Sequence, residues 1–145
     1  MSASAGYSER ALFEKLGIKA SQRVAVLGAP DGFALEVPED VRVSTTARGT
    51  FDTIVSFHRE RADLEAHIPK LLDILDVDGG LWMAWPKRAS KVPTDLTEDG
   101  LRDIWLPRGL VDTKVAAIDA VWSGLRLCWR RELRDDVRAG RWPLR

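Results

Sequence analysis

The sequence has few of the residues that would support disulfide, metal or membrane chemistry. Its 145 residues include one cysteine and two histidines. A single cysteine cannot form an internal disulfide, and with only His58 and His67 it cannot complete a metal site. No run approaches the roughly 18 apolar residues of a membrane span, and residues 1–6 do not look like a secretory signal. We therefore expect a cytoplasmic protein with no metal and no membrane partner.

An excess of charge of one sign is also absent. Lys and Arg together number 22, as do Asp and Glu, so the formal net charge is zero. Domains that bind nucleic acid are usually basic, which argues against a nucleic-acid partner. The segment 126–145 is an exception, because it carries seven arginines against three acids, with Trp142 near its end. Such a segment either contacts nucleic acid or an acidic protein or is a solvated extension, and the neutral total charge favours the extension.

The length and composition are typical of one soluble globular domain. Hydrophobic residues make up 45% of the chain and charged residues 30%, which is enough to build a core without disulfides. We therefore predict a single domain over residues 1–145. Residues 1–6 are expected to be a disordered tail, and residues 132–145 an arginine-rich C-terminal extension.

The pattern of apolar residues predicts alternating strands and helices. A short helix is expected from Ser8 to Gly17, a longer one with an apolar face over 64–75, and a third from Thr94 or Asp95 to Leu106. The predicted turn at 78–80 ends the second helix region. Strand-like runs lie at 23–28, 41–45, 52–57, 81–85, 111–118 and 125–130. The order predicts a mostly parallel α/β sheet whose last two strands form an antiparallel hairpin.

Three of these segments carry a resemblance to a known family. The run 24–32 looks like a first strand with its glycine turn, 51–56 like a strand that opens with an aromatic-Asp pair, and 71–81 like the next turn and strand. Over residues 20–131 the chain thus resembles a class I methyltransferase. The resemblance implies a shortened Rossmann-like sheet that ends in the antiparallel hairpin.

Four further runs are similar to a bacterial family of small proteins of unknown function built on the same plan. These runs lie at 7–12, 24–33, 85–90 and 94–98. The similarity spans nearly the whole chain, but it implies no biochemical activity.

The methyltransferase resemblance implies S-adenosylmethionine as cofactor, but the matching positions depart from the family pattern. That family binds it with an acidic-x-Gly-x-Gly-x-Gly turn and with a second acid, after strand two, that holds the ribose. Here the first acid falls on Val26 and the central glycine on Pro30, which has no N–H to donate. Only Gly28 and Gly32 remain of the turn, and residues 44–46 contain no carboxylate. We therefore predict no cofactor, with S-adenosylmethionine as the alternative that these losses argue against.

The connection between the second and third strands is too short for the family's usual crossover. Residues 46–51 span at most about 20 Å when fully extended, whereas crossovers in parallel sheets usually need about a dozen residues or more. The intervening strand and helices of the family are therefore missing. Either the second strand is very short, or it runs antiparallel at the edge of the sheet.

A candidate pocket is expected where the carboxyl ends of the strands meet, since ligands bind there in open α/β sheets. Lys87 and Lys91 would supply charge, Trp122 a flat wall, and Asp119 an acceptor or base, which suits a small anionic or aromatic ligand. In the alternative, these are solvated loops in which Asp119 and Ser123 make turns and Trp122 closes the core. The candidate residues are Gly28, Pro30, Asp31, Gly32, Lys87, Ser90, Lys91, Asp119, Trp122 and Ser123.

These observations favour a degenerate methyltransferase-like domain that binds a small ligand or a protein partner without methyl transfer. One alternative is an enzyme with a non-standard pocket, using Lys87 and Asp119 or divergent S-adenosylmethionine chemistry. Another is an interaction module that acts through the basic tail and an exposed apolar patch at Trp105 or Trp142. His58 and His67 are expected to be solvated or hydrogen-bonded rather than catalytic.

Overall fold

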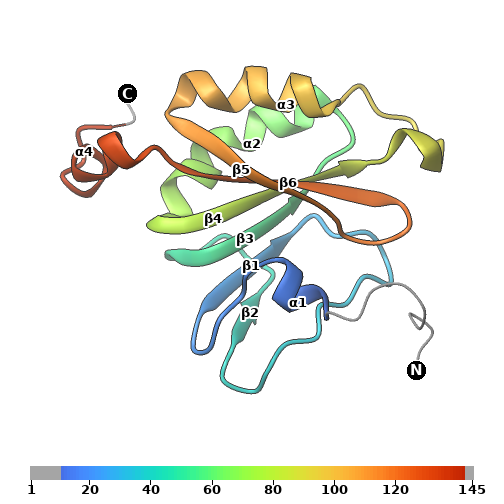
Figure 1. Ribbon diagram of the computed structural model, residues 1–145, viewed down its shortest axis with the longest axis horizontal. Coiled ribbons are helices and arrows are strands. Elements are labelled where there is room, and N and C mark those ends of the chain that lie inside the picture. Colours follow the sequence, from blue (N-terminus) through green and yellow to red (C-terminus); the bar gives the residue numbers. More distant parts are fainter. Residues whose placement is uncertain (1–10, 143–145) are drawn as a thin grey trace.

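Six strands form one mixed sheet in the order β2-β1-β3-β4-β6-β5 in the computed structural model, which describes residues 11–142 (Figure 1). The first four strands of that order pair in parallel, and β6 runs antiparallel to both of its neighbours. This confirms the predicted mostly parallel sheet with a terminal hairpin. The strands are β1 (Arg23–Leu27), β2 (Arg42–Ser44), β3 (Phe51–Phe57), β4 (Leu75–Pro86), β5 (Leu110–Ala117) and β6 (Trp122–Trp129).

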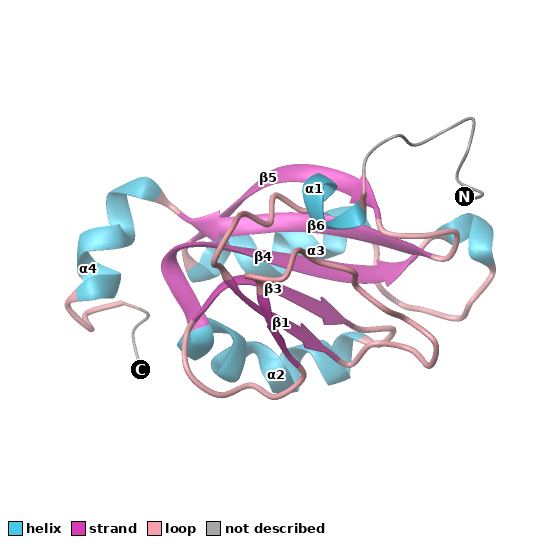
Figure 2. Ribbon diagram, turned by 90° about the horizontal axis from the view of Figure 1, so that it is seen from below, coloured by secondary structure: helices cyan, strands magenta, loops and turns pink. Residues whose placement is uncertain are grey.

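Helices cover the two faces of the sheet unequally. On one face lie α2 (Arg61–Ile74) and α3 (Glu98–Trp105), and on the other α1 (Leu12–Lys15) is the only α-helix among the described residues, as Figures 1 and 2 show. A fourth helix, α4 (Arg134–Arg138), sits at one end of the sheet. The predicted tail at 1–6, the helix start at Ser8 and the last residues of the extension lie outside the described residues.

Each face of the sheet buries its own apolar cluster. Alternate residues of a strand point to opposite faces, so Ile54 of β3 packs toward α2 and α3 while Val55 packs toward α1. The α2 face includes Leu64, Leu71 and Trp105, and the periodic apolar positions of the longer helix are therefore core positions, as predicted. Trp82 and Trp85 of β4 are buried as well, one toward each face.

The second strand is very short and parallel, which resolves the problem of the six-residue connection. β2 has three residues, and Arg42 to Ser44 pair in register with Arg23 to Ala25 of β1. Because so short a strand advances the chain little, the following loop can return to the start of β3. Within residues 11–142 the edge of the sheet is therefore β2.

The predicted turn at Asp78-Gly79-Gly80 is wrong, because these residues lie within β4. The strand is twelve residues long, and its pairing with β3 shifts register between Phe51 and Thr53. A Cβ on Gly79 would lie 2.6 Å from the carbonyl oxygen of Asp52. The glycine is thus needed for the close approach of two strands at a bulge and not for a turn.

The start of α3 and the ends of the hairpin also differ from the prediction. Thr97 is the N-cap of α3, since its Oγ1 accepts from the N–H of Gly100 at 3.0 Å. Thr94 and Asp95 instead contact the start of α2, where Asp95 accepts from the N–H of Arg61 at 2.7 Å. The second hairpin strand begins at Trp122, so Trp122 is a strand residue and not a loop residue.

Candidate functional site

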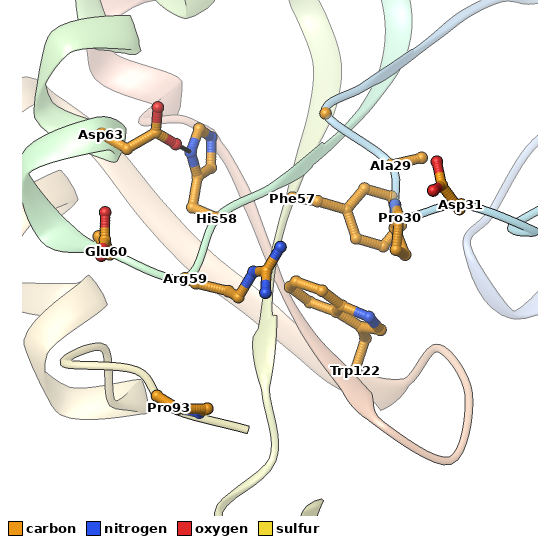
Figure 3. Close-up of a pocket in the computed structure, with 11 residues that line it drawn as sticks. Ala29, Pro30, Asp31, Phe57, His58, Arg59, Glu60, Asp63, Pro93 and Trp122 are labelled. Atoms are coloured by element: carbon orange, nitrogen blue, oxygen red, sulfur yellow. Dashed lines mark hydrogen bonds and ion pairs between the residues drawn. The ribbon is translucent and has the colours of Figure 1, made fainter. Parts of the chain in front are cut away.

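An open cleft of about 700 Å³ lies at the carboxyl edge of the parallel strands. Its walls come from the loop after β1, from the segment that joins β3 to α2, and from the first residue of β6 (Figure 3). The chain leaves β1 toward β2 on one side and β3 lies on the other, so the cleft stands at the point where the strand order reverses. This is where α/β sheets of this type bind ligands.

The loop after β1 forms one wall and is held close to the end of β3. Gly28 has a φ of +69°, and a Cβ at this position would lie 3.0 Å from the carbonyl oxygen of Phe57. Only glycine meets both requirements without strain. The loop continues through Pro30 to Asp31, whose carboxylate lies at the rim of the cleft (Figure 3).

Aromatic side chains form the floor of the cleft. The ring of Phe57 contacts that of Trp122 edge to face, with centroids 5.1 Å apart, and a second edge contact at 4.9 Å joins Phe57 to Phe33. Trp122 is only 6% exposed, and the part that remains accessible faces the cleft. The floor therefore offers a rigid, flat apolar surface.

The opposite wall carries a buried histidine with a partner on each ring nitrogen. Nε2 of His58 lies 2.7 Å from Oγ of Ser56, and Nδ1 lies 2.6 Å from Oδ2 of Asp63. Burial lowers the pKa of His58 below 6.5, although the hydrogen bond with Asp63 acts in the other direction. The ring is thus neutral at pH 7, with Nδ1–H donating to Asp63 and Nε2 accepting from Ser56.

This order of residues resembles a Ser-His-Asp triad, but the structure does not support a serine nucleophile. Ser56 is 2% exposed and does not line the cleft. A nucleophile must reach a substrate atom, and this hydroxyl is enclosed within the sheet. The exposed member is instead Asp63, whose side chain is 48% accessible.

The charged groups around the cleft are mostly unpaired. Among residues 11–142, the side chains of Asp31, Arg59 and Glu60 have no hydrogen bond or ion pair. With Asp63, the walls present three carboxylates and one guanidinium. Because His58 is neutral, the cleft is acidic.

The structure brings four of the predicted site residues together and disperses the others. Gly28, Pro30, Asp31 and Trp122 line the cleft. Lys91 lies with Arg88 on a separate cleft of about 450 Å³, beside the start of α3. The remaining predicted residues, Gly32, Lys87, Ser90, Asp119 and Ser123, line neither cleft.

Two of the residues that line neither cleft make hydrogen bonds within their own loops. Oγ of Ser90 donates to the carbonyl oxygen of Lys87 at 2.6 Å and accepts from the N–H of Val92 at 3.2 Å. Oδ1 of Asp119 accepts from the N–H groups of Val121 and Trp122, at 2.8 Å each. These are the turn contacts of the alternative interpretation given above.

Sequence analysis missed the residues contributed by the end of β3 and the start of α2. His58, Arg59, Glu60 and Asp63 all come from this segment. The signal was available, because parallel strands on either side of a reversal place their following loops in the same crevice. Only the loops after the first and fourth strands and the hairpin were considered.

A smaller cleft of about 340 Å³ lies between the ends of β1 and β2. Val26, Val43 and Thr45 are on its walls, and no carboxylate is among the residues that line it. The hydroxyl of Ser44 lies 3.1 Å from that of Thr46 and accepts from its N–H at 3.1 Å, so these groups are used within the turn. The positions where the methyltransferase pattern has its two acids are therefore apolar or locally bonded.

Comparison of the sequence with protein-family profiles and with curated proteins finds no match. The structure is similar to solved methyltransferases. A ribosomal protein L11 methylase from Lactobacillus delbrueckii has 16% identity and a TM-score of 0.53, with 83% of this chain and 76% of that one covered. A TehB-like S-adenosylmethionine-dependent methyltransferase from Corynebacterium glutamicum has 11% identity and a TM-score of 0.57, with 88% and 92% covered.

A third similar structure is the magnesium protoporphyrin IX methyltransferase from Synechocystis, solved with S-adenosylmethionine bound. It has 11% identity and a TM-score of 0.54, with 82% of this chain and 74% of that one covered. At these identities the similarity concerns the fold. The chain therefore has a methyltransferase-like, Rossmann-type α/β fold, as the resemblance implied.

Within the described residues, Arg134, Arg138 and Arg141 of the arginine-rich segment contact acids or carbonyl oxygens, and the neighbouring tryptophans form no exposed apolar patch. Arg138 pairs with Asp78 at 3.3 Å, and Arg141 pairs with Asp136 at 2.8 Å. Trp105 is fully buried, and Nε1 of Trp142 donates to the carbonyl oxygen of Arg108 at 3.0 Å.

The helices over residues 11–142 include none with the length and apolarity needed to cross a membrane.

Proposed function

We propose that this protein binds a small molecule with a cationic group beside a flat apolar group, and that it does so without methyl transfer. The observation that carries the proposal is the cleft at the carboxyl edge, with unpaired carboxylates on its walls and an aromatic floor. Its volume of about 700 Å³ is suited to a small ligand. The protein is thus a ligand-binding domain on a methyltransferase-like scaffold.

The charge of the cleft supports a cationic ligand instead of the anionic one suggested by Lys87 and Lys91. Those two lysines do not line this cleft, whereas Asp31, Glu60 and Asp63 do. An ammonium group beside Asp31 or Glu60 would gain a charge-assisted hydrogen bond that neither carboxylate has with the residues that the structure describes. A flat ring would lie against Trp122, where an adjacent cation also interacts favourably with the indole face.

S-adenosylmethionine does not suit the residues present if it binds as in the family pattern. The ribose acid has no counterpart among residues 44–46, and Ser44 and Thr46 bond to one another. Pro30 removes a donor from the turn, and Val26 provides apolar surface where an acid is needed. With β2 at the edge of the sheet, no further strand from the described part of the chain covers that side of the ligand site. We therefore assign no cofactor.

A pair of probes with one ring system and opposite charge tests the proposal. Tryptamine carries an ammonium group and indole-3-acetate a carboxylate, so the difference in their dissociation constants isolates the charge preference. The readout is the indole N–H signal of Trp122 in a ¹H–¹⁵N spectrum, assigned with a Trp122→Phe variant. We expect tryptamine to shift this signal and to bind about tenfold more tightly or better. Equal binding, or tighter binding of indole-3-acetate, contradicts the proposal.

S-adenosylhomocysteine provides the test of lost methyltransferase chemistry. A ligand at 100 times its dissociation constant stabilises a protein by about 2.7 kcal/mol, which for a chain of this size raises Tm by on the order of 5 °C or more. We expect no such rise. A rise of that size would return methyl transfer to the leading interpretation.

The cytoplasmic location and the similarity to the bacterial family of small proteins stay predictions.

A further inference from the structure

We propose that His58, Asp63 and His67 form a binding site for one divalent transition-metal ion, Zn²⁺ in the first place, at the wall of the cleft. Each residue offers one ligand atom, and the three atoms lie within 4.8 Å of one another. The site goes beyond the ligand-binding function proposed above and does not depend on it. It also differs from the sequence-based expectation, which considered cysteine and histidine but no carboxylate.

The three residues come from one short stretch whose local structure brings them together. His58 follows the last residue of β3, while Asp63 and His67 are one turn apart on α2 and therefore share a face of that helix. The rings of the two histidines have centroids 5.4 Å apart. Two imidazoles and one carboxylate are a donor set that zinc enzymes use when they keep a coordination position open.

The carboxylate of Asp63 lies close to both imidazole rings. With metal–ligand bonds of about 2.0–2.1 Å, neighbouring ligand atoms are separated by about 3.3–3.4 Å. Oδ1 of Asp63 lies 3.5 Å from Nδ1 of His67, and Oδ2 lies 2.6 Å from Nδ1 of His58. The spacing to His58 requires a small opening of one hydrogen bond. His67 would coordinate through Nε2, because its Nδ1 donates to the carbonyl oxygen of Asp63, and its ring already lies beside the carboxylate.

The surroundings of each histidine fix its ring in the way that metal ligands require. Oγ of Ser56 contacts Nε2 of His58 at 2.7 Å. A hydroxyl both donates and accepts. Ser56 can therefore donate to Nε2 of His58 while the ring proton is on Nδ1, and it can accept from Nε2–H once a metal ion occupies Nδ1. Nδ1 of His67 donates to the carbonyl oxygen of Asp63 at 2.7 Å, which leaves Nε2 with a lone pair. These are outer contacts of the kind that orient metal-binding histidines.

The remaining coordination positions of the ion would face the cleft. His58 and Asp63 line the cleft, whereas His67 does not. A donor atom of a bound small molecule could therefore complete the coordination from the open side. Zinc and not magnesium or calcium is favoured, because two of the three donors are imidazole nitrogens.

The test uses the untagged full chain after treatment with EDTA, titrated with Zn²⁺ alone. The chain has only two histidines, so their Cε1–H signals report on the site without ambiguity. We expect one equivalent of Zn²⁺ to shift both signals together. The dissociation constant from calorimetry should rise by about 100-fold or more in His67→Ala and by about 10- to 100-fold in Ser56→Ala.

A matched control separates this site from weak binding to the surface of α2. Glu65→Gln removes another exposed carboxylate of the same helix and should leave the affinity unchanged. Zinc that shifts the signal of His67 alone, or an affinity that His67→Ala does not change, overturns the proposal. His67→Ala should also keep the binding of tryptamine, so failure of the metal site and failure of the ligand site give different results.

Discussion

The two ends of the sheet are both rich in charge, yet they use it in opposite ways. At the carboxyl end, Asp31, Arg59 and Glu60 surround a cleft and have no partner among the residues that the structure describes. At the amino end, Asp78 at the start of β4 pairs with Arg134 at 3.8 Å and with Arg138 at 3.3 Å. Figure 1 shows α4 at this second end of the sheet.

The difference shows that the number of charges in a segment does not mark a site. The arginine-rich segment has the larger charge in the sequence, but Arg134, Arg138 and Arg141 contact acids and carbonyl oxygens nearby. Such exposed pairs contribute little to stability and leave little potential for a partner. The cleft has fewer charges, but most of them are unpaired and they line it together with aromatic residues, and the proposed ligand binding rests on this arrangement.

The largest effect, on stability, is expected at Gly28, and Gly140 at the other end of the sheet has a similar φ and serves as the comparison. Gly28 has a φ of +69° and is crowded by the carbonyl oxygen of Phe57, whereas Gly140 has a φ of +76° with nothing within 4 Å of an added Cβ. Gly28→Ala should lower the free energy of unfolding by about 3 kcal/mol, from strain and from crowding together. Gly140→Ala should lower it by about 1 kcal/mol, from strain alone. Urea unfolding measures both, and equal losses would show that the loop after β1 is not held tightly.

The next largest effect concerns tryptamine binding, and it distinguishes the acids of the cleft from Asp78 at the other end of the sheet. The double variant Asp31→Asn with Glu60→Gln should weaken tryptamine binding by about tenfold, because two favourable charge contacts are lost. Its free energy of unfolding should change by less than about 0.5 kcal/mol, since neither side chain has a partner between residues 11 and 142. Asp78→Asn should do the reverse, with a loss of up to about 1 kcal/mol in stability and no change in binding. A loss of binding in Asp78→Asn would show that the two ends are coupled.

A pH effect is expected from a paired acid away from the cleft. Asp112 of β5 accepts from Arg102 of α3 at 2.9 Å, and this contact lowers the pKa of the Asp112 carboxyl below 3.8. The Asp112 carboxyl therefore binds a proton less tightly in the folded protein than in the unfolded chain. The pair stabilises the fold above pH 3.8, and its contribution is lost as the pH falls below this value. Between about pH 5 and pH 2.5, the free energy of unfolding should therefore fall by less in Asp112→Asn than in the wild type, as measured by urea unfolding. An identical loss in both would show that the pair does not contribute.

The smallest effect is expected for nucleic acid. Because the arginines of α4 are paired, the wild type should bind a DNA duplex no more tightly than about 10⁻⁴ M at physiological salt, which is the weak limit of non-specific binding. Arg138→Gln with Arg141→Gln should therefore change little in a fluorescence-anisotropy titration. Binding near 10⁻⁶ M that weakens steeply with salt, and that these substitutions remove, would restore the interaction-module alternative.

Much of the fold follows from local patterns in the sequence. The period of Leu64, Ile68 and Leu71 placed α2, and the apolar runs placed five of the strands to within a few residues. The direction of β2 could not be read in this way, because both short parallel and antiparallel strands satisfy the same three residues. The glycines at 79 and 80 were mistaken for a turn, since a close strand approach and a turn need the same residue.

By itself, the sequence determined the class of the fold, the order of its elements and the loss of the methyltransferase acids at Val26 and at residues 44–46. Each of these depends on residues close together in the chain. The tertiary structure alone decided which charges are unpaired, because pairing joins residues as distant as Asp78 and Arg138. It also decided that His58, Asp63 and Trp122 meet at one cleft while Lys87 and Asp119 do not line it. The physical reason is that a site is defined by side-chain directions at the ends of several strands, and these are fixed only when the sheet is assembled.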